Sequence, residues 1–275
     1  MKFQFTLIIT FLFFLTNCAQ LPKTKLPLWK QKLEPEVSND SLRIQFNNPL
    51  NCPLRISAKT SNGAIQEKIA NNFPVLIDPH KDTLFTYWTN QSQDEIPINF
   101  SLTIGNPNDS IHKKKINLPF KKGNKYKIIQ GYNGSYSHNS EYVKCAIDFN
   151  LLKGDTICAA ADGFVVGVIE GYERGGRLKR WTDYANYIIV FHPEMNIYTE
   201  YVHLTYNGSL VEVGDYVKSE QAIGLSGKTG RTDVEHLHFN VLKSIKSGNG
   251  MESTEINFVE GYRGVDLKKG DWVEK

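Results

Sequence analysis

The stretch Glu235-His236-Leu237-His238-Phe239-Asn240-Val241 decides how the second half of this chain folds. As a β-strand, it would place His236, His238 and Asn240 on one face and its apolar residues on the other, because side chains alternate with period two. The apolar face would enter a core and hold the two imidazoles parallel, about 7 Å apart at their Cα atoms. That spacing suits one zinc ligand beside one group that handles protons.

A single His-x-His is more often a polar strand face than a metal site, so the other histidines matter. The chain has only seven. Two of them, His138 and His203, lie in settings from which they could converge with His236, His238 and one aspartate. The small number of histidines therefore favours a site over a chance polar face.

Composition limits the classes of protein that fit. The 275 residues allow one large domain or two ordinary ones, and the hydrophobic fraction of 40% is enough for a real core. The net charge is +3, and the longest basic run is Lys113-Lys114-Lys115, so no nucleic-acid partner is predicted. A slightly cationic surface would suit an anionic polymer such as a cell wall.

The N-terminus predicts export. Residues 1–17 contain Lys2 and then an apolar run from Phe5 to Leu15, which is short for a transmembrane helix. Leu15-Thr16-Asn17-Cys18 resembles a bacterial lipobox, in which the cysteine is acylated and becomes the mature N-terminus. We expect a lipoprotein that faces the periplasm or cell envelope and is held to a membrane through Cys18. The alternative is an ordinary secretory signal with an incidental cysteine.

The remaining cysteines do not define a disulfide. With Cys18 acylated, three remain, so one disulfide and one free thiol are possible, but the sequence does not choose the pair among Cys52, Cys145 and Cys158. The chain has no Cys-x-x-Cys spacing, which argues against a thiolate zinc site or a redox motif.

Patterning after the signal predicts an all-β protein in three parts. Residues 18–40 are rich in Lys, Pro and Glu and are expected to form a tether. Short alternating runs broken by Asn, Pro and Gly predict a small β-sandwich-like accessory domain over residues 41–122. Strands and turns continue through residues 123–275, which we expect to form a second domain that carries the chemistry.

Further candidates lie in this second domain. His138 ends a loop rich in Gly, Asn and Ser, and Asp148 follows in a short strand whose Ile147 and Phe149 would face the core. A turn or a salt bridge is the ordinary alternative for Asp148. In the stretch 198–204, Tyr201 and His203 are expected to share a strand face.

Several motifs occur in an order that resembles the lysostaphin-type (LytM-like) zinc endopeptidases, which cut cell-wall peptides. The resemblance covers residues 130–243 and rests on Ser137-His138, Ala146-Ile147-Asp148-Phe149, Gly154-Asp155-Thr156, Ala159-Ala160-Ala161-Asp162-Gly163, Asn186-Tyr187, Tyr201-Val202-His203-Leu204, Val213-Gly214-Asp215, Ile223-Gly224-Leu225-Ser226-Gly227-Lys228-Thr229-Gly230 and His236-Leu237-His238-Phe239. The family often has three residues between the first His and the Asp. This chain has the nine residues 139–147, a longer insertion that occurs in one branch of the family.

The resemblance implies an antiparallel β-sheet with an open groove, the duplicated hybrid motif of the family. It implies that zinc is bound by His138, Asp148 and His238, and that His203 and His236 are catalytic residues beside the metal. Tyr201 and Asn186 are weaker candidates for contacts with substrate or oxyanion. The expected activity is hydrolysis of peptide cross-links in bacterial peptidoglycan.

The chemistry of these residues agrees with the resemblance. Two imidazoles and one carboxylate leave a fourth zinc position open for water, whose pKa zinc lowers towards about 7. His236 is then expected to take a proton from the water and pass it to the leaving amine, while His203 donates a hydrogen bond to the oxyanion. Two alternatives stay open: a catalytically inactive cell-wall-binding or regulatory module of the same fold, and a secreted peptidase with a protein substrate.

Overall fold

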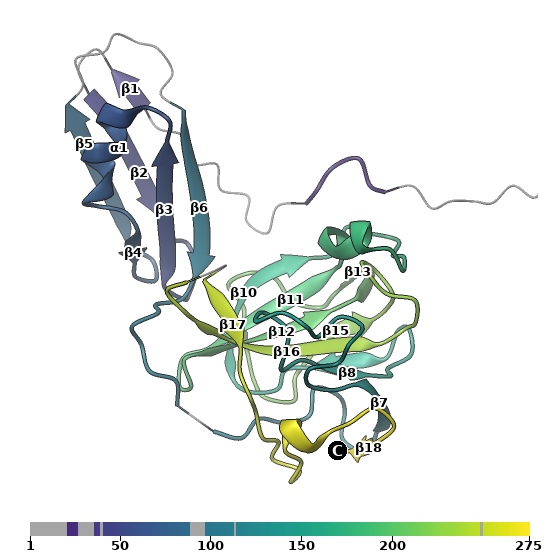
Figure 1. Ribbon diagram of the computed structural model, residues 1–275. Coiled ribbons are helices and arrows are strands. Elements are labelled where there is room, and N and C mark those ends of the chain that lie inside the picture. The colour runs from purple at the N-terminus through teal and green to yellow at the C-terminus, as the bar shows by residue number, and fades with distance from the viewer. Residues whose placement is uncertain (1–20, 27–35, 39–40, 89–96, 113, 248–249) are drawn as a thin grey trace, which may run out of the picture.

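The computed structural model describes residues 21–26, 36–38, 41–88, 97–112, 114–247 and 250–275 (Figure 1). Within these ranges the chain forms the strands β1 to β18, one short α-helix and two short 3-10 helices. The expected all-β class is confirmed. No helix among these residues has the length and apolar character needed to cross a membrane. The expected signal peptide and Cys18 lie outside the described residues.

The N-terminal part contains two small antiparallel sheets and one helix, shown in purple and blue in Figure 1. Apolar and polar residues alternate in the first long strand: Leu42, Ile44 and Phe46 are buried, and the residues between them are exposed. One sheet contains β1 (Glu36–Ser38), β2 (Ser41–Asn47) and β5 (Asp82–Trp88). The other contains β4 (Val75–Ile77), β3 (Leu54–Thr60) and β6 (Ile98–Ile104), with α1 (Gly63–Ala70) following β3.

This N-terminal part ends earlier than the sequence indicated. Ile116, Leu118 and Phe120 are fully buried in the core of the following domain rather than in the sandwich. The sandwich therefore ends near β6, and the boundary expected at residue 122 moves to about residue 105. The alternating residues 116–120 have the same apolar pattern in either domain, so pattern alone could not assign them.

The second domain is organised around a nine-stranded sheet. Its strand order is β14-β10-β11-β12-β16-β8-β7-β18, with β17 added beside β16, and every pair is antiparallel. The strands are β7 (Lys125–Gln130), β8 (Ile147–Phe149), β10 (Gly163–Ile169), β11 (Tyr187–His192), β12 (Ile197–Val202), β14 (Tyr216–Val217), β16 (Leu237–Ser244), β17 (Met251–Ser253) and β18 (Trp272–Glu274).

A second, three-stranded sheet packs against the large one. It contains β13 (Leu204–Ser209), β15 (Ala222–Ser226) and β9 (Thr156–Cys158). The two 3-10 helices, η1 (Lys179–Tyr184) and η2 (Gly264–Asp266), lie in the connections. The core includes the apolar face predicted for the opening stretch: Leu237, Phe239 and Val241 are each at most 1% exposed. Burial of this face turns His238 and Asn240 to the opposite side of the sheet.

The two parts of the chain share a second apolar cluster. Phe46 and Ile56 of the sandwich belong to the same buried cluster as Val166 and Phe191 of the large sheet. Arg55 also donates from Nη1 to the carbonyl oxygen of Ile245, at 2.8 Å. The sandwich therefore shares buried contacts with the large sheet, and Figure 1 shows the ends of β3 and β6 beside β17.

The described part of the expected tether contacts the second domain. Lys25 forms an ion pair with Asp183, and the backbone N–H of Leu26 donates to the Tyr172 hydroxyl at 2.6 Å. Residues 21–26 of the expected tether therefore lie against the loop that leads from β10 to β11.

Cys52, Cys145 and Cys158 are all free thiols in the structure. The disulfide that the sequence left open is therefore absent among these three residues.

Candidate metal and catalytic site

Strand register brings three polar side chains into one row. Asp148 on β8 lies opposite His238 on β16 on one side and opposite Gln130 on β7 on the other. Ile147 and Phe149 are buried in the core, as predicted, so Asp148 must point to the other face of the sheet. The site is thus positioned by backbone pairing across three adjacent strands.

His138 lies on a loop rather than on a strand. The backbone N–H of His138 donates to the Gly134 carbonyl at 2.9 Å, which closes the turn over residues 134–138. Its side chain is fully buried, and its Nδ1 lies 2.9 Å from the Gly131 carbonyl oxygen. Two backbone carbonyls of one loop therefore fix both the position and the ring orientation of His138.

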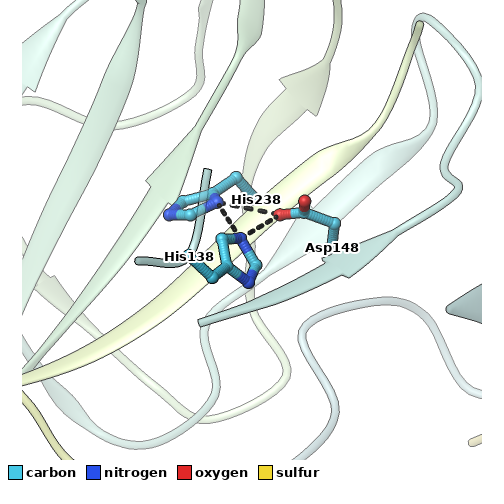
Figure 2. A group of neighbouring side chains, drawn as sticks. All are labelled: His138, Asp148 and His238. Carbon is cyan, nitrogen blue, oxygen red and sulfur yellow. Dashed lines mark hydrogen bonds and ion pairs between the residues drawn. The ribbon is translucent and has the colours of Figure 1, made fainter. Parts of the chain in front are cut away.

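Three ligand-type atoms converge at the centre of this arrangement. Asp148 Oδ1 lies 2.8 Å from His238 Nδ1 and 3.1 Å from His138 Nε2, and the two ring nitrogens are 3.2 Å apart. Figure 2 shows the three side chains pointing toward one another, His238 from the yellow strand β16 and Asp148 from the teal strand β8. This is the His-Asp-His group that the sequence suggested, and its chemistry suits a metal ion.

The balance of hydrogen-bond donors and acceptors among His138, Asp148 and His238 favours a bound cation between them. A carbonyl oxygen can only accept, so His138 Nδ1 carries the proton, and neutral His138 presents a lone pair at Nε2. That lone pair faces a carboxylate oxygen and a second ring nitrogen. The triangle therefore has more acceptors than donors when the imidazoles are neutral, and a bound cation would satisfy all three atoms at once.

Two more histidines lie beside the triangle. His203 and His236 have ring centroids 4.5 Å apart, and His236 Nε2 lies 3.9 Å from Asp148 Oδ1. Each Nδ1 faces a backbone carbonyl: His203 that of Thr229 at 2.6 Å, and His236 that of Val234 at 3.1 Å. Both rings are therefore held as the tautomer that carries its proton on Nδ1 and leaves Nε2 as an acceptor.

Burial and charge set the protonation of the cluster. Burial opposes ionisation of Asp148, but the neighbouring imidazoles of His236, His138 and His238 together hold the pKa of that carboxyl well below its usual range. Burial lowers the pKa of His203 well below its ordinary value, and it also lowers the pKa of His236, against the pull of Asp148. Burial lowers the pKa of His138 as well, but the hydrogen bond and charge of Asp148 outweigh it and raise the pKa overall. The cluster thus combines an anionic ligand with two flanking imidazoles that are neutral at neutral pH.

A groove gives access to the cluster. It has a volume of about 620 Å³, and its lining includes Asp148, His203 and His236. One wall is the loop 129–137 and the other is the segment 231–234. A third segment, 267–269, borders the groove from the C-terminal end of the chain. The groove thus gives solvent and a bound molecule access to His203 and His236.

The structure does not bring Tyr201 to the groove. Tyr201 is fully buried in the core, where its hydroxyl accepts from Ala160 N at 2.8 Å. The prediction that Tyr201 and His203 share a face was wrong because β12 ends at Val202 and His203 has a φ of 70°. That left-handed residue breaks the period-two alternation and turns the His203 side chain into the site while Tyr201 stays in the core.

Asn186 is likewise not part of the groove lining. Its side chain is fully buried, with Oδ1 accepting from Tyr172 N at 2.9 Å. Its Nδ2 donates to the Tyr172 carbonyl at 2.7 Å and to the Thr205 carbonyl at 3.1 Å. These backbone contacts use the amide fully, so Asn186 joins two loops behind His203 and does not offer a donor to a substrate.

Sequence reasoning missed two supporting residues. Gln130 Nε2 donates to Asp148 Oδ2 at 3.1 Å and to Ser137 Oγ at 2.7 Å, so it links the carboxylate ligand to the His138 loop. Thr229 supplies the carbonyl that orients His203 and donates its hydroxyl to the Leu204 carbonyl at 2.7 Å. Both residues lie within residues 130–243, the range of the resemblance, but only the fold reveals their partners.

Comparison with known proteins gives a consistent picture. Residues 142–252 match the profile of Peptidase family M23, a segment that contains Asp148, His203, His236 and His238. A protein of Buchnera aphidicola described as an uncharacterized metalloprotease is 32% identical over 131 residues, which are 46% of this chain and 30% of that protein. A peptidoglycan DD-endopeptidase of Vibrio cholerae is 34% identical over 107 residues, which are 38% of this chain and 22% of that enzyme.

Among solved structures, the catalytic domain of lysostaphin from Staphylococcus simulans is 28% identical with a TM-score of 0.32. That match covers 49% of this chain and 88% of the lysostaphin domain. The chain spans less than a third of the length of the two relatives above.

Proposed function

Because residues 142–252 belong to Peptidase family M23, we propose that this protein is a zinc-dependent endopeptidase that hydrolyses the peptide cross-links of bacterial peptidoglycan. The observation that carries the proposal is the convergence of His138, Asp148 and His238 beside His203 and His236, next to a groove whose lining includes Asp148, His203 and His236. A relative named as a peptidoglycan DD-endopeptidase supports the choice of substrate.

The ligand atoms favour zinc over harder cations. His138 Nε2, Asp148 Oδ1 and His238 Nδ1 are two nitrogens and one oxygen, the donor set of catalytic zinc sites, whereas calcium and magnesium prefer oxygen alone. When bound, zinc would supply Lewis-acid chemistry and lower the pKa of a water towards about 7. Gln130 would hold Asp148 in its binding rotamer through Oδ2, the oxygen that does not face the histidines.

His236 is the group best placed to move protons. Its Nδ1–H is engaged by the Val234 carbonyl, so Nε2 faces the groove as an acceptor. Because burial lowers its pKa, the imidazole is neutral at neutral pH and ready to take a proton from an attacking water. The protonated Nε2 can then donate this proton to the leaving amine, so the same atom takes the proton from water and gives it to the amine.

His203 is held in the same tautomer, and this affects its role. Its neutral Nε2 is an acceptor, so donation to an oxyanion requires the imidazolium form, which burial opposes. We assign to neutral His203 the orientation of the attacking water, with donation to the oxyanion only after it has gained a proton. The left-handed backbone of His203 is consistent with a side chain held in place for function.

We propose further that the protein is exported and anchored to a membrane by acylation of Cys18. The support is the lipobox-like stretch 15–18. The segment 21–26 would then keep the peptidase domain near the membrane, since Lys25 and Leu26 contact it directly.

The test of the function is digestion of purified peptidoglycan. Protein loaded with zinc should release soluble peptide fragments, each cut adding one free amine that can be counted chemically. Treatment with a chelator should stop the release and added zinc should restore it. Zinc-loaded protein that binds peptidoglycan yet releases no fragment would favour an inactive binding module of the same fold.

A further inference from the structure

The groove is lined by three cations that have no anionic partner. Arg231, Lys268 and Lys269 all border it, and none of them forms an ion pair within the described ranges. The carboxylates of the lining are engaged elsewhere: Asp148 faces the histidines, and Asp233 lies 3.9 Å from Arg177. The rim of the groove therefore carries an unbalanced positive charge next to the reacting groups.

Arg231 is the cation nearest in the chain to the proton-handling residue. It precedes Thr232, whose hydroxyl lies 3.3 Å from His236 Nδ1. Its guanidinium rests 5.3 Å from the Tyr136 ring centroid, and its Nη2 makes one long hydrogen bond of 3.5 Å to the Tyr136 carbonyl. Its Nε–H is buried without an acceptor. The guanidinium thus makes only one protein hydrogen bond, and its exposed Nη donors are free to bind an acceptor on a ligand.

The two lysines come from a different part of the chain. The buried residue Leu267 presses its carbonyl oxygen against Gly131, where a Cβ would approach it to 2.2 Å. The backbone N–H of Lys268 donates to Asp271 Oδ2 at 2.8 Å, which fixes the turn. These two contacts hold the turn against the His138 loop, while Lys268 and Lys269 stay exposed at the groove. This segment lies outside the family match at 142–252.

We propose that Arg231, Lys268 and Lys269 select peptides that carry a free carboxylate close to the bond that is cut. This inference rests on the proposed peptidase function and adds a substrate preference to it. Arg231 would pair with the carboxylate through its unused donors, since a guanidinium matches a carboxylate in two parallel hydrogen bonds. Lys268 and Lys269 would attract the anionic peptide over a longer range, an effect that salt screens.

Paired probes test the preference. Cross-linked peptides released from peptidoglycan are used as prepared and after conversion of their free carboxylates to carboxamides. Binding to the zinc-loaded protein is measured by calorimetry, and cleavage is followed by chromatography at low and high salt. We expect the carboxylate form to bind about 10-fold to 100-fold more tightly, because a hydrogen bond to a charged group is worth on the order of 1.5–3 kcal/mol.

Variants locate the preference in the groove. Arg231→Gln should raise KM for the carboxylate peptide by about 10-fold or more while kcat changes little, and Arg231→Lys should restore only part of the loss. Lys268→Gln with Lys269→Gln should weaken binding by a few-fold at low salt and not at high salt. Lys122→Gln, an exposed charge outside the groove lining, is the matched control and should behave as wild type.

The outcomes separate this inference from the function on which it rests. If the carboxylate peptide binds more tightly but neither probe is cleaved, the peptidase function is contradicted and the carboxylate preference of the groove is supported. If the wild type binds and cleaves the two probes equally well, the carboxylate preference is contradicted, while the peptidase function still stands. If Arg231→Gln fails to fold, as judged by thermal melting, the exposed double lysine variant decides alone, and loss of its salt-dependent effect counts against the inference.

Discussion

Asp148 and His238 lie directly opposite each other in the antiparallel pair β8–β16, and Asp148 Oδ1 is 2.8 Å from His238 Nδ1. The hydrogen-bond register of two strands therefore sets the distance between two ligand atoms. A one-residue slip of either strand would turn its ligand to the other face of the sheet, so the pairing register decides whether the site exists.

Removing either side chain of this pair should abolish metal binding. Asp148→Asn and His238→Ala each leave two ligand atoms where three are needed, so zinc should fall from about one per chain to near zero after dialysis. Metal analysis of the purified proteins measures this. Asp82→Asn, a loss of the same charge at an exposed strand end, should keep its zinc. Full zinc occupancy in both ligand variants would show that the cluster is not the metal site.

Gln130→Ala should weaken zinc binding without removing a ligand. The amide orients Asp148 through Oδ2 and ties it to Ser137, and loss of such supporting contacts typically costs about 10-fold to 100-fold in affinity. Competition with a chelating dye gives the affinity. Gln45→Ala, an exposed residue of β2, is the matched control. An unchanged zinc affinity in Gln130→Ala would mean that the strand alone fixes the carboxylate.

Sequence patterning was sufficient for the parts of this site that depend on local periodicity. Leu237, Phe239 and Val241 alternate with polar residues, so their burial and the opposite direction of His238 followed from the period of a strand. The same reasoning failed at Tyr201, because the positive φ of His203 that ends β12 leaves no signature in residue types. Gln130 was missed because it meets Asp148 only after an irregularity in the β7–β8 pairing.

Glu200 should make stability depend on pH. Burial raises the pKa of this carboxyl from 4.5 to about 7, against hydrogen bonds from Tyr142 and Asn240. The folded state then binds the Glu200 proton more tightly than the unfolded state, so the contribution of this carboxyl to stability is fully present below about pH 4.5 and is lost as pH rises through 7.

Glu200→Gln keeps an acceptor for the Tyr142 hydroxyl and removes the titration. Relative to the wild type, the variant should gain on the order of 3 kcal/mol in unfolding free energy between pH 4.5 and 7. Denaturant titrations at several pH values measure the difference, with the exposed Glu67→Gln as control. Parallel pH profiles for wild type and Glu200→Gln would refute the assignment.

Cys18→Ser should release the protein from the membrane. If acylation of Cys18 is the anchor, the wild type should sediment with membranes and the variant should appear in the soluble fraction. Cys145→Ser, the same exchange at a partly buried free thiol, should still sediment. Equal distribution of wild type and Cys18→Ser between the fractions would contradict the lipoprotein proposal.

His203→Ala should separate metal binding from catalysis. His203 contacts the metal cluster only from the side, so the variant should keep its zinc and its melting temperature. Cleavage should fall on the order of 10²- to 10³-fold, because the variant loses the group that orients the attacking water and, once protonated, donates to the oxyanion. Release of peptide fragments, measured with zinc content on the same sample, gives both values. Loss of zinc from this variant would make His203 a ligand instead.

The account depends most directly on a metal-loaded site in which His236 moves the proton. The decisive measurement is release of soluble peptides from purified peptidoglycan by wild type and His236→Ala, with zinc content determined on the same samples. We predict that both proteins hold about one zinc per chain and that the variant cuts about 10²- to 10⁴-fold more slowly. A zinc-loaded wild type that releases no peptide, or a His236→Ala variant that cuts as fast as the wild type, would contradict the account.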